Sequence, residues 1–295
     1  MSTACLFPGQ GSQFVGMGKD LFDSNPKAAD RFLMADKLLD YPLSNIMFNG
    51  PQEKLTETRY TQPAIFLHSF ALFESLELNL DRAAGHSLGE FTAIVVSGAM
   101  DFECGLKLVS LRGSLMQQAS ESEPGTMAAV IGLKDHEVEK LCKQASDETE
   151  KQVVPANYNC PGQLVVSGDV IAVERTVELA KEQGCRLAKL LPVSGAFHSP
   201  LMQSAYKGLK SRLEEINMKK PDFPVYSNYT AKAVSDPEEI RNNVLQQLLN
   251  PVLWTQTLQQ MYQDGVTRFV EVGPGNVLRG LVKRTLKEVS IEGYQ

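Results

Sequence analysis

The chain has 295 residues, of which 43% are hydrophobic and 22% are charged, a composition typical of a globular protein that buries a large core. Its formal net charge of −6 argues against a protein devoted to nucleic-acid binding, because such surfaces are basic. Neither a signal peptide nor an apolar run long enough to span a bilayer is recognisable, so we expect a cytoplasmic protein without a membrane contact. The five cysteines are widely spaced and form no Cys-x-x-Cys pair, which favours reduced thiols and predicts no metal site.

Strand-like and helix-like segments alternate in the first hundred residues. They are a strand over 4–9 that ends in a glycine loop, an amphipathic helix over 25–40, a polar loop over 44–61 and a buried helix over 62–78. We expect Pro63 in the first turn of that last helix, where a missing N–H is tolerated. Residues 81–87 have little β-propensity, and the apolar run over 88–100 suits a buried helix.

The middle of the chain differs from its flanks in the order of its elements. A strand, a helix, two strands, a helix and a strand are expected at 126–133, 135–146, 151–158, 162–169, 171–184 and 185–193. This β-α-β-β-α-β order is typical of a ferredoxin-like unit. We therefore predict an α/β protein with a largely parallel sheet, in which residues 126–195 form a small subdomain inserted into a large one made of residues 1–125 and 196–295.

The sequence GHSLGE at 85–90 places a serine between two glycines. A nucleophile elbow needs small flanking residues, because its serine occupies a strained strand-to-helix turn, and Gly85 and Gly89 meet that need. The helix expected after Ser87 would direct its N-terminal N–H groups and its dipole at a developing oxyanion. An ordinary glycine-flanked turn explains the same residues equally well, so the case for a nucleophile depends on a base.

Four histidines are available as that base. His86 adjoins Ser87 and would point elsewhere, and His68 lies in an apolar helix where a core role is more common. His136 begins a polar helix in the small subdomain. His198 remains, where the small subdomain returns to the large one, and a histidine at such a junction can face a cleft. No carboxylate stands in a recognisable relation to this pair, so a backbone or amide carbonyl could hold the imidazole tautomer.

Two further polar residues stand in informative contexts. The loop PGQGSQFVGMG at 8–18 does not fit a phosphate-binding pattern, since Phe14 occupies the third glycine position, but it leaves Gln10 as a hydrogen-bond donor at the end of a strand. Arg112 lies in the apolar context CGLKLVSLRGSLM, although a solvated helix arginine is the commoner case. A buried guanidinium needs a carboxylate, which its planar fork binds through two hydrogen bonds.

Eight motifs now occur in one order along the chain. They are FPGQGSQ at 7–13, TQPAIF at 61–66, GHSLGE at 85–90, LRGSLMQ at 111–117, NYNCPGQ at 157–163, AFHSPLM at 196–202, NPVLW at 250–254 and EVGPG at 271–275. Together they closely resemble the malonyl-CoA:acyl-carrier-protein transacylase family over essentially the whole chain. The resemblance implies an α/β-hydrolase-like core with an inserted ferredoxin-like subdomain, in agreement with the order of segments.

The resemblance also implies a role for each matching residue. Ser87 would be the nucleophile, and His198 would be its base and later its acid. Gln10 and the main-chain N–H of Leu88 would form the oxyanion hole. Gln247 would orient His198 through its main-chain carbonyl, which would explain the absence of an acidic partner.

Substrate contacts follow from the same motifs. Arg112 would bind the free carboxylate of the malonyl group. In related polyketide acyltransferases, a Phe directly before the histidine accompanies malonyl as the substrate, and a Ser there accompanies methylmalonyl. Phe197 therefore favours malonyl. Gly195, two residues before Phe197, is smaller than the residues often found at that position. Further substrate-binding residues on this basis are Asn157, Asn159 and Met116.

The expected activity is ping-pong transfer of malonyl from malonyl-CoA to the phosphopantetheine thiol of an acyl carrier protein in fatty acid synthesis, with no bound cofactor and a monomeric enzyme. The alternatives are a serine hydrolase of acyl-CoA or acyl-carrier esters, a trans-acting polyketide acyltransferase and a non-catalytic binding module. Because carrier proteins are acidic, a local basic surface must offset the negative charge of this chain. A solvated helix face explains the available cations equally well; these are Lys189, Arg279, Lys283, Arg284 and Lys287.

Overall fold

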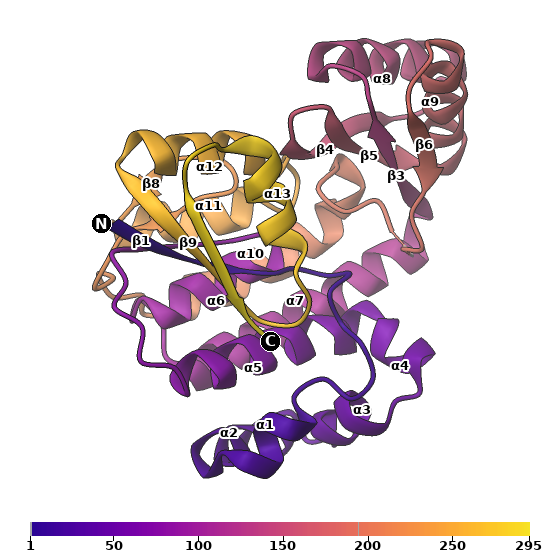
Figure 1. Ribbon diagram of the computed structural model, residues 1–295. Helices are drawn as coiled ribbons and strands as arrows, with labels where there is room; N and C mark the ends of the chain where they lie inside the picture. The colour runs from indigo at the N-terminus through magenta and orange to yellow at the C-terminus, as the bar shows by residue number, and fades with distance from the viewer. Residues whose placement is uncertain (1, 194) are drawn as a thin grey trace.

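The structure, a computed structural model, describes residues 2–193 and 195–295 and contains two separate sheets (Figure 1). The larger sheet has the strand order β10-β9-β1-β2-β7-β8, and its strands are parallel except at the β7–β8 pair. Its strands span Ser2–Phe7 (β1), Arg82–Gly85 (β2), Val225–Tyr226 (β7), Ala233–Val234 (β8), Val266–Val272 (β9) and Ser290–Tyr294 (β10). The α/β fold class predicted from the sequence is confirmed.

Helices cover both faces of this sheet. In chain order they are α1 (Lys19–Ser24), α2 (Pro26–Leu39), α3 (Leu43–Asn49), α4 (Gln52–Thr56), α5 (Thr58–Glu74), α6 (Leu88–Val96), α7 (Phe102–Ser122), η1 (Pro200–Met202), α10 (Gln203–Glu215), α11 (Pro237–Gln246), α12 (Trp254–Gln263) and α13 (Val277–Thr285). The alternation of side chains along β1 sets the layers, because successive residues of a strand face opposite sides. Cys5 and Phe7 join the core under α5 and α6, whereas Ala4 and Leu6 join the core under α12 and α13.

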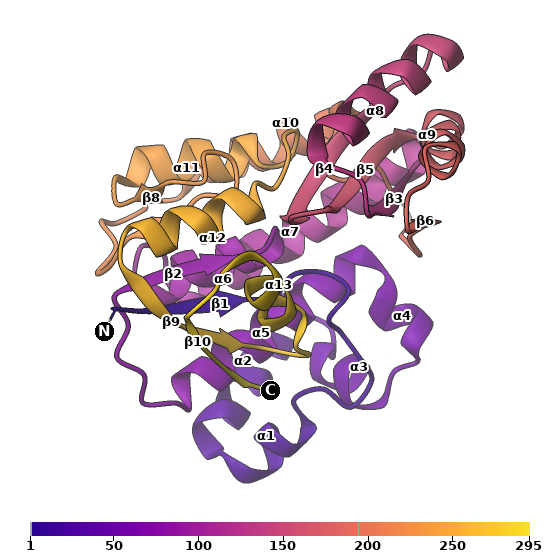
Figure 2. The same ribbon diagram turned by 45° about the horizontal axis from the view of Figure 1, so that its top comes forward.

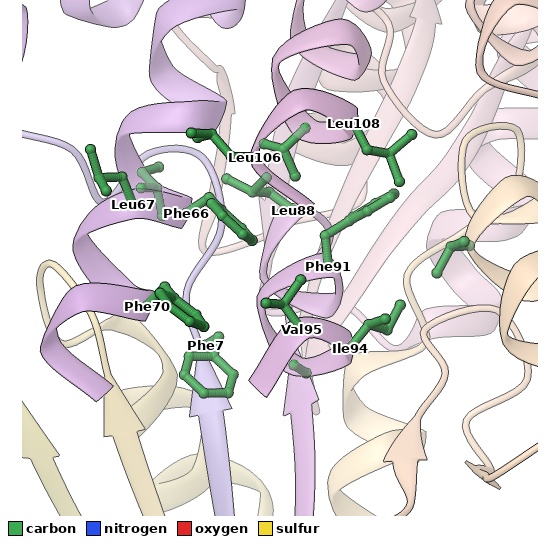
Figure 3. Close-up of a cluster of buried hydrophobic side chains, with 14 of the residues drawn as sticks. Phe7, Phe66, Leu67, Phe70, Leu88, Phe91, Ile94, Val95, Leu106 and Leu108 are labelled. Carbon is green, nitrogen blue, oxygen red and sulfur yellow. The ribbon is translucent and has the colours of Figure 1, made fainter. Parts of the chain in front are cut away.

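Helix α6 is the central element of the larger core. Every residue from Leu88 to Val95 is buried, and Figure 3 shows Phe91 and Val95 packed among side chains of α5, α7 and β1. A helix that is apolar on all sides is stable only when it is surrounded by protein. The burial of α6 therefore fixes the position of its first turn, and with it the position of Ser87, which immediately precedes the helix.

The inserted elements form the second sheet and project to one side of the larger unit in both views (Figures 1 and 2). They run β3 (Gly125–Ile131), α8 (Asp135–Thr149), β4 (Val153–Cys160), β5 (Gln163–Asp169), α9 (Val170–Glu182) and β6 (Leu187–Leu190). The sheet is antiparallel with the order β4-β5-β3-β6, which is the ferredoxin-like arrangement expected from the order of elements. A hydrophobic cluster of its own lies between this sheet and its two helices.

Two local expectations are wrong. The segment 44–61 is not a polar loop, because α3 and α4 occupy most of it, and it continues into α5. Apolar side chains in this segment and just before it explain this, since α3 buries Leu43, Ile46 and Met47 on one helical face. Pro63 also lies inside α5 rather than in its first turn, because the helix begins at Thr58.

The glycines around the β2–α6 turn give a stability prediction. A Cβ atom on Gly89 would lie 2.0 Å from the carbonyl oxygen of Phe7, whereas one on Gly280 in α13 would meet no atom within 4 Å. We expect Gly89→Ala to lower the free energy of unfolding by about 2 kcal/mol or more through overpacking. The matched control Gly280→Ala should raise it by about 0.5–1 kcal/mol, because alanine favours helix. Urea denaturation of both variants checks this, and a shift in the same direction for both would contradict it.

Candidate active site

The site lies where parallel strands of the large sheet end. Gln10 follows β1, Ser87 follows β2, and Asn228 follows β7. The carboxyl ends of parallel strands meet at one edge of a sheet, which is where α/β proteins bind their ligands. The loops that carry His198 and Gln247 meet at the same edge, and both side chains are buried there.

Ser87 occupies a strained turn. Its φ of 51° and ψ of −105° lie outside the regions that serine normally adopts. A Cβ atom on Gly85 would lie only 1.8 Å from the carbonyl carbon of Gly89, so both glycines are needed for the chain to turn this tightly. The main-chain N–H of Ser87 donates to Oδ1 of Asn228 at 2.7 Å, which fixes the turn from the β7 side. This geometry is that of a nucleophile elbow.

His198 lies directly against the serine. Its Nε2 is 2.8 Å from Ser87 Oγ, and its Nδ1 is 2.7 Å from the main-chain carbonyl oxygen of Gln247. A carbonyl only accepts hydrogen bonds, so Nδ1 carries the proton and Nε2 is free to accept the serine proton. Burial and the nearby charge of Arg112 lower the pKa of His198 to about 3, which keeps the imidazole neutral and ready to act as a base.

Arg112 is buried beside the same serine, as its apolar context suggests. Its Nη2 donates to Ser87 Oγ at 3.2 Å and to Gln247 Oε1 at 2.9 Å, and its Nη1 donates to Gln62 Oε1 at 2.7 Å. Its buried Nε has no partner, and within the described chain the guanidinium forms no ion pair. Burial lowers the pKa of Arg112 to about 9, so it is still a cation at neutral pH.

A cavity opens onto this group from between the two sheets. Its lining contains eight of the residues picked out in the sequence, together with others, and comprises Gln10, Gln62, His86, Ser87, Leu88, Arg112, Met116, Met127, Asn157, Leu191, Val193, Phe197 and His198. Gln10 donates to Thr58 Oγ1 at 3.3 Å, and Met116 Sδ accepts from Gln62. The absence of a side chain at Gly195 has a steric cause, because a Cβ atom there would lie 1.9 Å from Ser120 Oγ.

The two asparagines of NYNCPGQ have different surroundings. Asn157 lines the cavity, and its buried Oδ1 has no hydrogen-bond partner within the described residues. Asn159 does not line the cavity; its Oδ1 lies 2.8 Å from Nε2 of His86, which does. The structure therefore separates two residues that the motif had grouped together.

Three buried residues of the site were not singled out from the sequence. Gln62 and Glu90 lie within the quoted motifs TQPAIF and GHSLGE, and each is a polar residue in an apolar helix, which is the signal that could have found them. Asn228 follows a strand of only two residues and left no such signal. Together they hold Arg112, Gln247 and the serine turn.

Three further features of the described chain concern metal binding, membrane-spanning helices and the cations considered for carrier docking. Residues 2–193 and 195–295 contain no group of three or more His, Cys, Asp or Glu side chains placed to hold a metal ion. No helix in the same part of the chain has the length and apolar content needed to cross a membrane. The five cations considered for carrier docking fall into two groups. Arg279, Lys283 and Arg284 lie on α13 and Lys287 just after it, and α13 packs beside the edge strand β4. Lys189 lies on β6, the opposite edge strand of the same sheet.

The neutral state of His198 gives a pH prediction. Its lowered pKa means that the base stays unprotonated as the pH falls to 5, so Ser87 should react with a fluorophosphonate at a rate that changes less than about twofold between pH 8 and 5. An ordinary histidine with a pKa of about 6.5 would slow the reaction about 30-fold over this range. Burial raises the pKa of Glu90 to about 7, so the profile is also measured in Glu90→Gln. A decline centred between pH 6 and 7 that persists in this variant would contradict the assignment.

Comparison with known proteins places this chain in a family. The model of the acyl transferase domain family matches residues 5–294. The malonyl CoA-acyl carrier protein transacylase of Staphylococcus aureus (strain MW2) is 41% identical over 294 residues, covering 99% of this chain and 95% of the relative.

Solved structures agree. An acyl carrier protein S-malonyltransferase from Vibrio cholerae O1 biovar eltor superposes with a TM-score of 0.95 at 41% identity, covering 100% of this chain and 97% of that one. A malonyl-transacylase solved in complex with its type II polyketide acyl carrier protein gives 0.93 at 38% identity, covering 99% and 95%. The chain therefore belongs to the acyl transferase family of the malonyl-CoA:acyl-carrier-protein transacylases, and it is an acyltransferase.

Proposed function

We propose that this enzyme transfers malonyl from malonyl-CoA to the phosphopantetheine thiol of an acyl carrier protein through an ester on Ser87. The single observation that carries the proposal is the buried Arg112 guanidinium, which lies 3.2 Å from Ser87 Oγ and forms no ion pair within the described chain. A substrate with a thioester at one end and a carboxylate at the other satisfies both groups. Malonyl-CoA is such a substrate.

The first half-reaction forms the ester. Ser87 Oγ attacks the thioester carbonyl while Nε2 of His198 takes the serine proton. The oxyanion that forms accepts hydrogen bonds from the main-chain N–H of Leu88 and from the side-chain amide of Gln10, both at the cavity wall. The intermediate then collapses, the C–S bond breaks, and CoA leaves as a thiol after taking the proton from His198.

The second half-reaction is the same chemistry in reverse. The carrier thiol replaces CoA, gives its proton to His198 and attacks the ester carbonyl. The C–O bond to Ser87 then breaks, and the serine recovers its proton. No redox step or additional cofactor is needed, because each half-reaction exchanges one acyl bond for another and returns the histidine to its neutral form.

The acyl pocket favours a small acid. Phe197 and Met116 line the cavity next to Arg112, so an α-methyl branch would meet the ring of Phe197. Asn157 brings an unpaired buried oxygen to the same cavity, where it can accept a hydrogen bond from the amides of the pantetheine arm. Asn159 acts on the cavity indirectly, through its hydrogen bond to His86, which lines the cavity.

Fatty acid synthesis is the pathway we favour for this enzyme, which we expect to act as a monomer in the cytoplasm. A polyketide carrier is the main alternative, because one structural neighbour was solved with such a partner. For carrier docking we favour the exposed cations of α13, Lys283 and Arg284, over Lys189. Arg279 is less suitable, since it lies 3.4 Å from the buried carboxylate of Glu271.

The ester itself is the first test. After mixing with malonyl-CoA, intact-protein mass spectrometry should show the mass of one malonyl group, and peptide mapping should place it on Ser87. The ester should persist in buffer and disappear when a carrier thiol is added, because the acyl group is held for transfer. Loss of the ester to water at a comparable rate without the thiol would instead support a serine hydrolase. Ser87→Ala should bind malonyl-CoA without acquiring the mass.

Selectivity tests the role of Arg112. Arg112→Ala should lower kcat/KM for malonyl transfer by about 100-fold or more and for acetyl transfer by less than about 10-fold, because only malonyl loses a required charged partner. Arg175→Ala is the control; this arginine lies on α9 in a surface ion pair with Glu148 and should leave both rates unchanged. Equal losses for malonyl and acetyl would reject the role of Arg112.

A further inference from the structure

Glu90 is a buried carboxylate that the catalytic steps above do not use. It lies in the first turn of α6, is only 2% exposed, and is surrounded by the apolar residues of that helix. A buried carboxylate is costly unless hydrogen bonds or charges compensate it. Its Oε2 accepts from two donors, the side-chain Nε2 of Gln247 at 2.6 Å and the main-chain N–H of Asn228 at 3.1 Å. Each donor belongs to a residue that also touches the reacting groups.

The first contact fixes which end of an amide faces the arginine. The Nε2 of Gln247 is held by Glu90 and by the main-chain oxygen of Ser87 at 3.0 Å, so its Oε1 points at Arg112 Nη2. A reversed amide would place its NH₂ group against the guanidinium, which has only donors. The same residue supplies the carbonyl that binds His198 Nδ1. Glu90 therefore acts on the base and on the arginine through one glutamine.

The second contact reaches the nucleophile. Asn228 accepts from the N–H of Ser87 through Oδ1 at 2.7 Å and donates to the carbonyl of Gly85 through Nδ2 at 2.8 Å. These two bonds span the strained turn on both sides of His86. Because Glu90 binds the main-chain N–H of Asn228, it fixes the residue that holds the turn.

We propose that Glu90 is a positioning residue for acyl transfer, whose single buried oxygen aligns Gln247 and Asn228 and, through them, the base, the arginine and the nucleophile. The proposal rests on the proposed function for its assay. The charged group that faces Glu90 is Arg112 on α7. Length matters more than charge in this arrangement, because the bonds require an acceptor at this distance and a neutral amide oxygen also supplies one.

Two substitutions separate length from charge. Glu90→Gln keeps the reach and an oxygen acceptor but loses the charge, whereas Glu90→Asp keeps the charge and loses one methylene of reach. In single-turnover measurements of ester formation on Ser87, we expect the Gln variant to stay within about fivefold of the parent and the Asp variant to fall about 50-fold or more. Glu271→Gln is the matched control, since Glu271 is also buried and also accepts two hydrogen bonds, in its case both from main-chain N–H groups, and it should behave like the parent.

The outcome is decisive in either direction. An Asp variant that equals or exceeds the Gln variant would overturn the proposal, because charge alone would then matter. If Glu90→Asp does not fold, Glu90→Leu replaces it as a variant whose side chain has no hydrogen-bond acceptor, with the same loss expected. A second readout is the double variant Glu90→Asp/Gln247→Ala, whose loss should be smaller than the product of the two single losses, because both changes remove the same contact between Glu90 and Gln247. Multiplicative losses would overturn the route through Gln247. A parent enzyme that forms no malonyl ester would refute the proposed function instead.

Discussion

The site depends on a guanidinium that the protein buries without giving it a carboxylate. Arg112 is held by two glutamine oxygens and by Ser87 Oγ, all of them neutral. Burying a cation in this way is unfavourable, and the charge lowers the pKa of His198 as well. The charge of the buried Glu90 carboxylate favours the charged arginine but does not contact it. In the proposed function an acidic acyl group pairs with the arginine and relieves both effects, which would be a physical basis for selecting malonyl over acetyl.

The small subdomain is joined to this site through the backbone. The N–H of Tyr158 on β4 donates to the carbonyl of Val252 at 2.9 Å, and Val252 N–H donates back to Ala156 at 2.8 Å. The N–H of Leu253, the next residue, donates to the carbonyl of Asn228 at 2.9 Å. Residues 250–254 thus connect the inserted sheet to Asn228, which holds the turn of Ser87, and the cavity wall formed by Asn157 is fixed relative to Ser87.

The sequence predicts much of this arrangement but misses two short helices and the buried residues that hold the site through long-range hydrogen bonds. The inserted unit could be found because its order of elements is a strong local pattern, whereas the glycine-flanked turn needed a base to support it and His198 was reached by elimination among four histidines. The prediction of a polar loop over 44–61 was wrong because a high content of polar residues hid the helical spacing of Leu43, Ile46 and Met47. Asn228 and Glu90 were missed for a different reason: their importance comes from contacts between residues 138 positions apart, and β7 is too short to show a period. Long-range hydrogen bonds of this kind leave no mark on the spacing of residues.

The most direct measurement of the central claim is a crystal structure of the malonyl ester, obtained by soaking the enzyme with malonyl-CoA. Paired recognition of the acyl group predicts the malonyl carboxylate on the Arg112 guanidinium through two hydrogen bonds, with the ester carbonyl oxygen facing the N–H of Leu88. A malonyl carboxylate directed into solvent, with Arg112 still bound to Gln62 and Gln247 alone, would contradict the claim that this arginine selects the substrate.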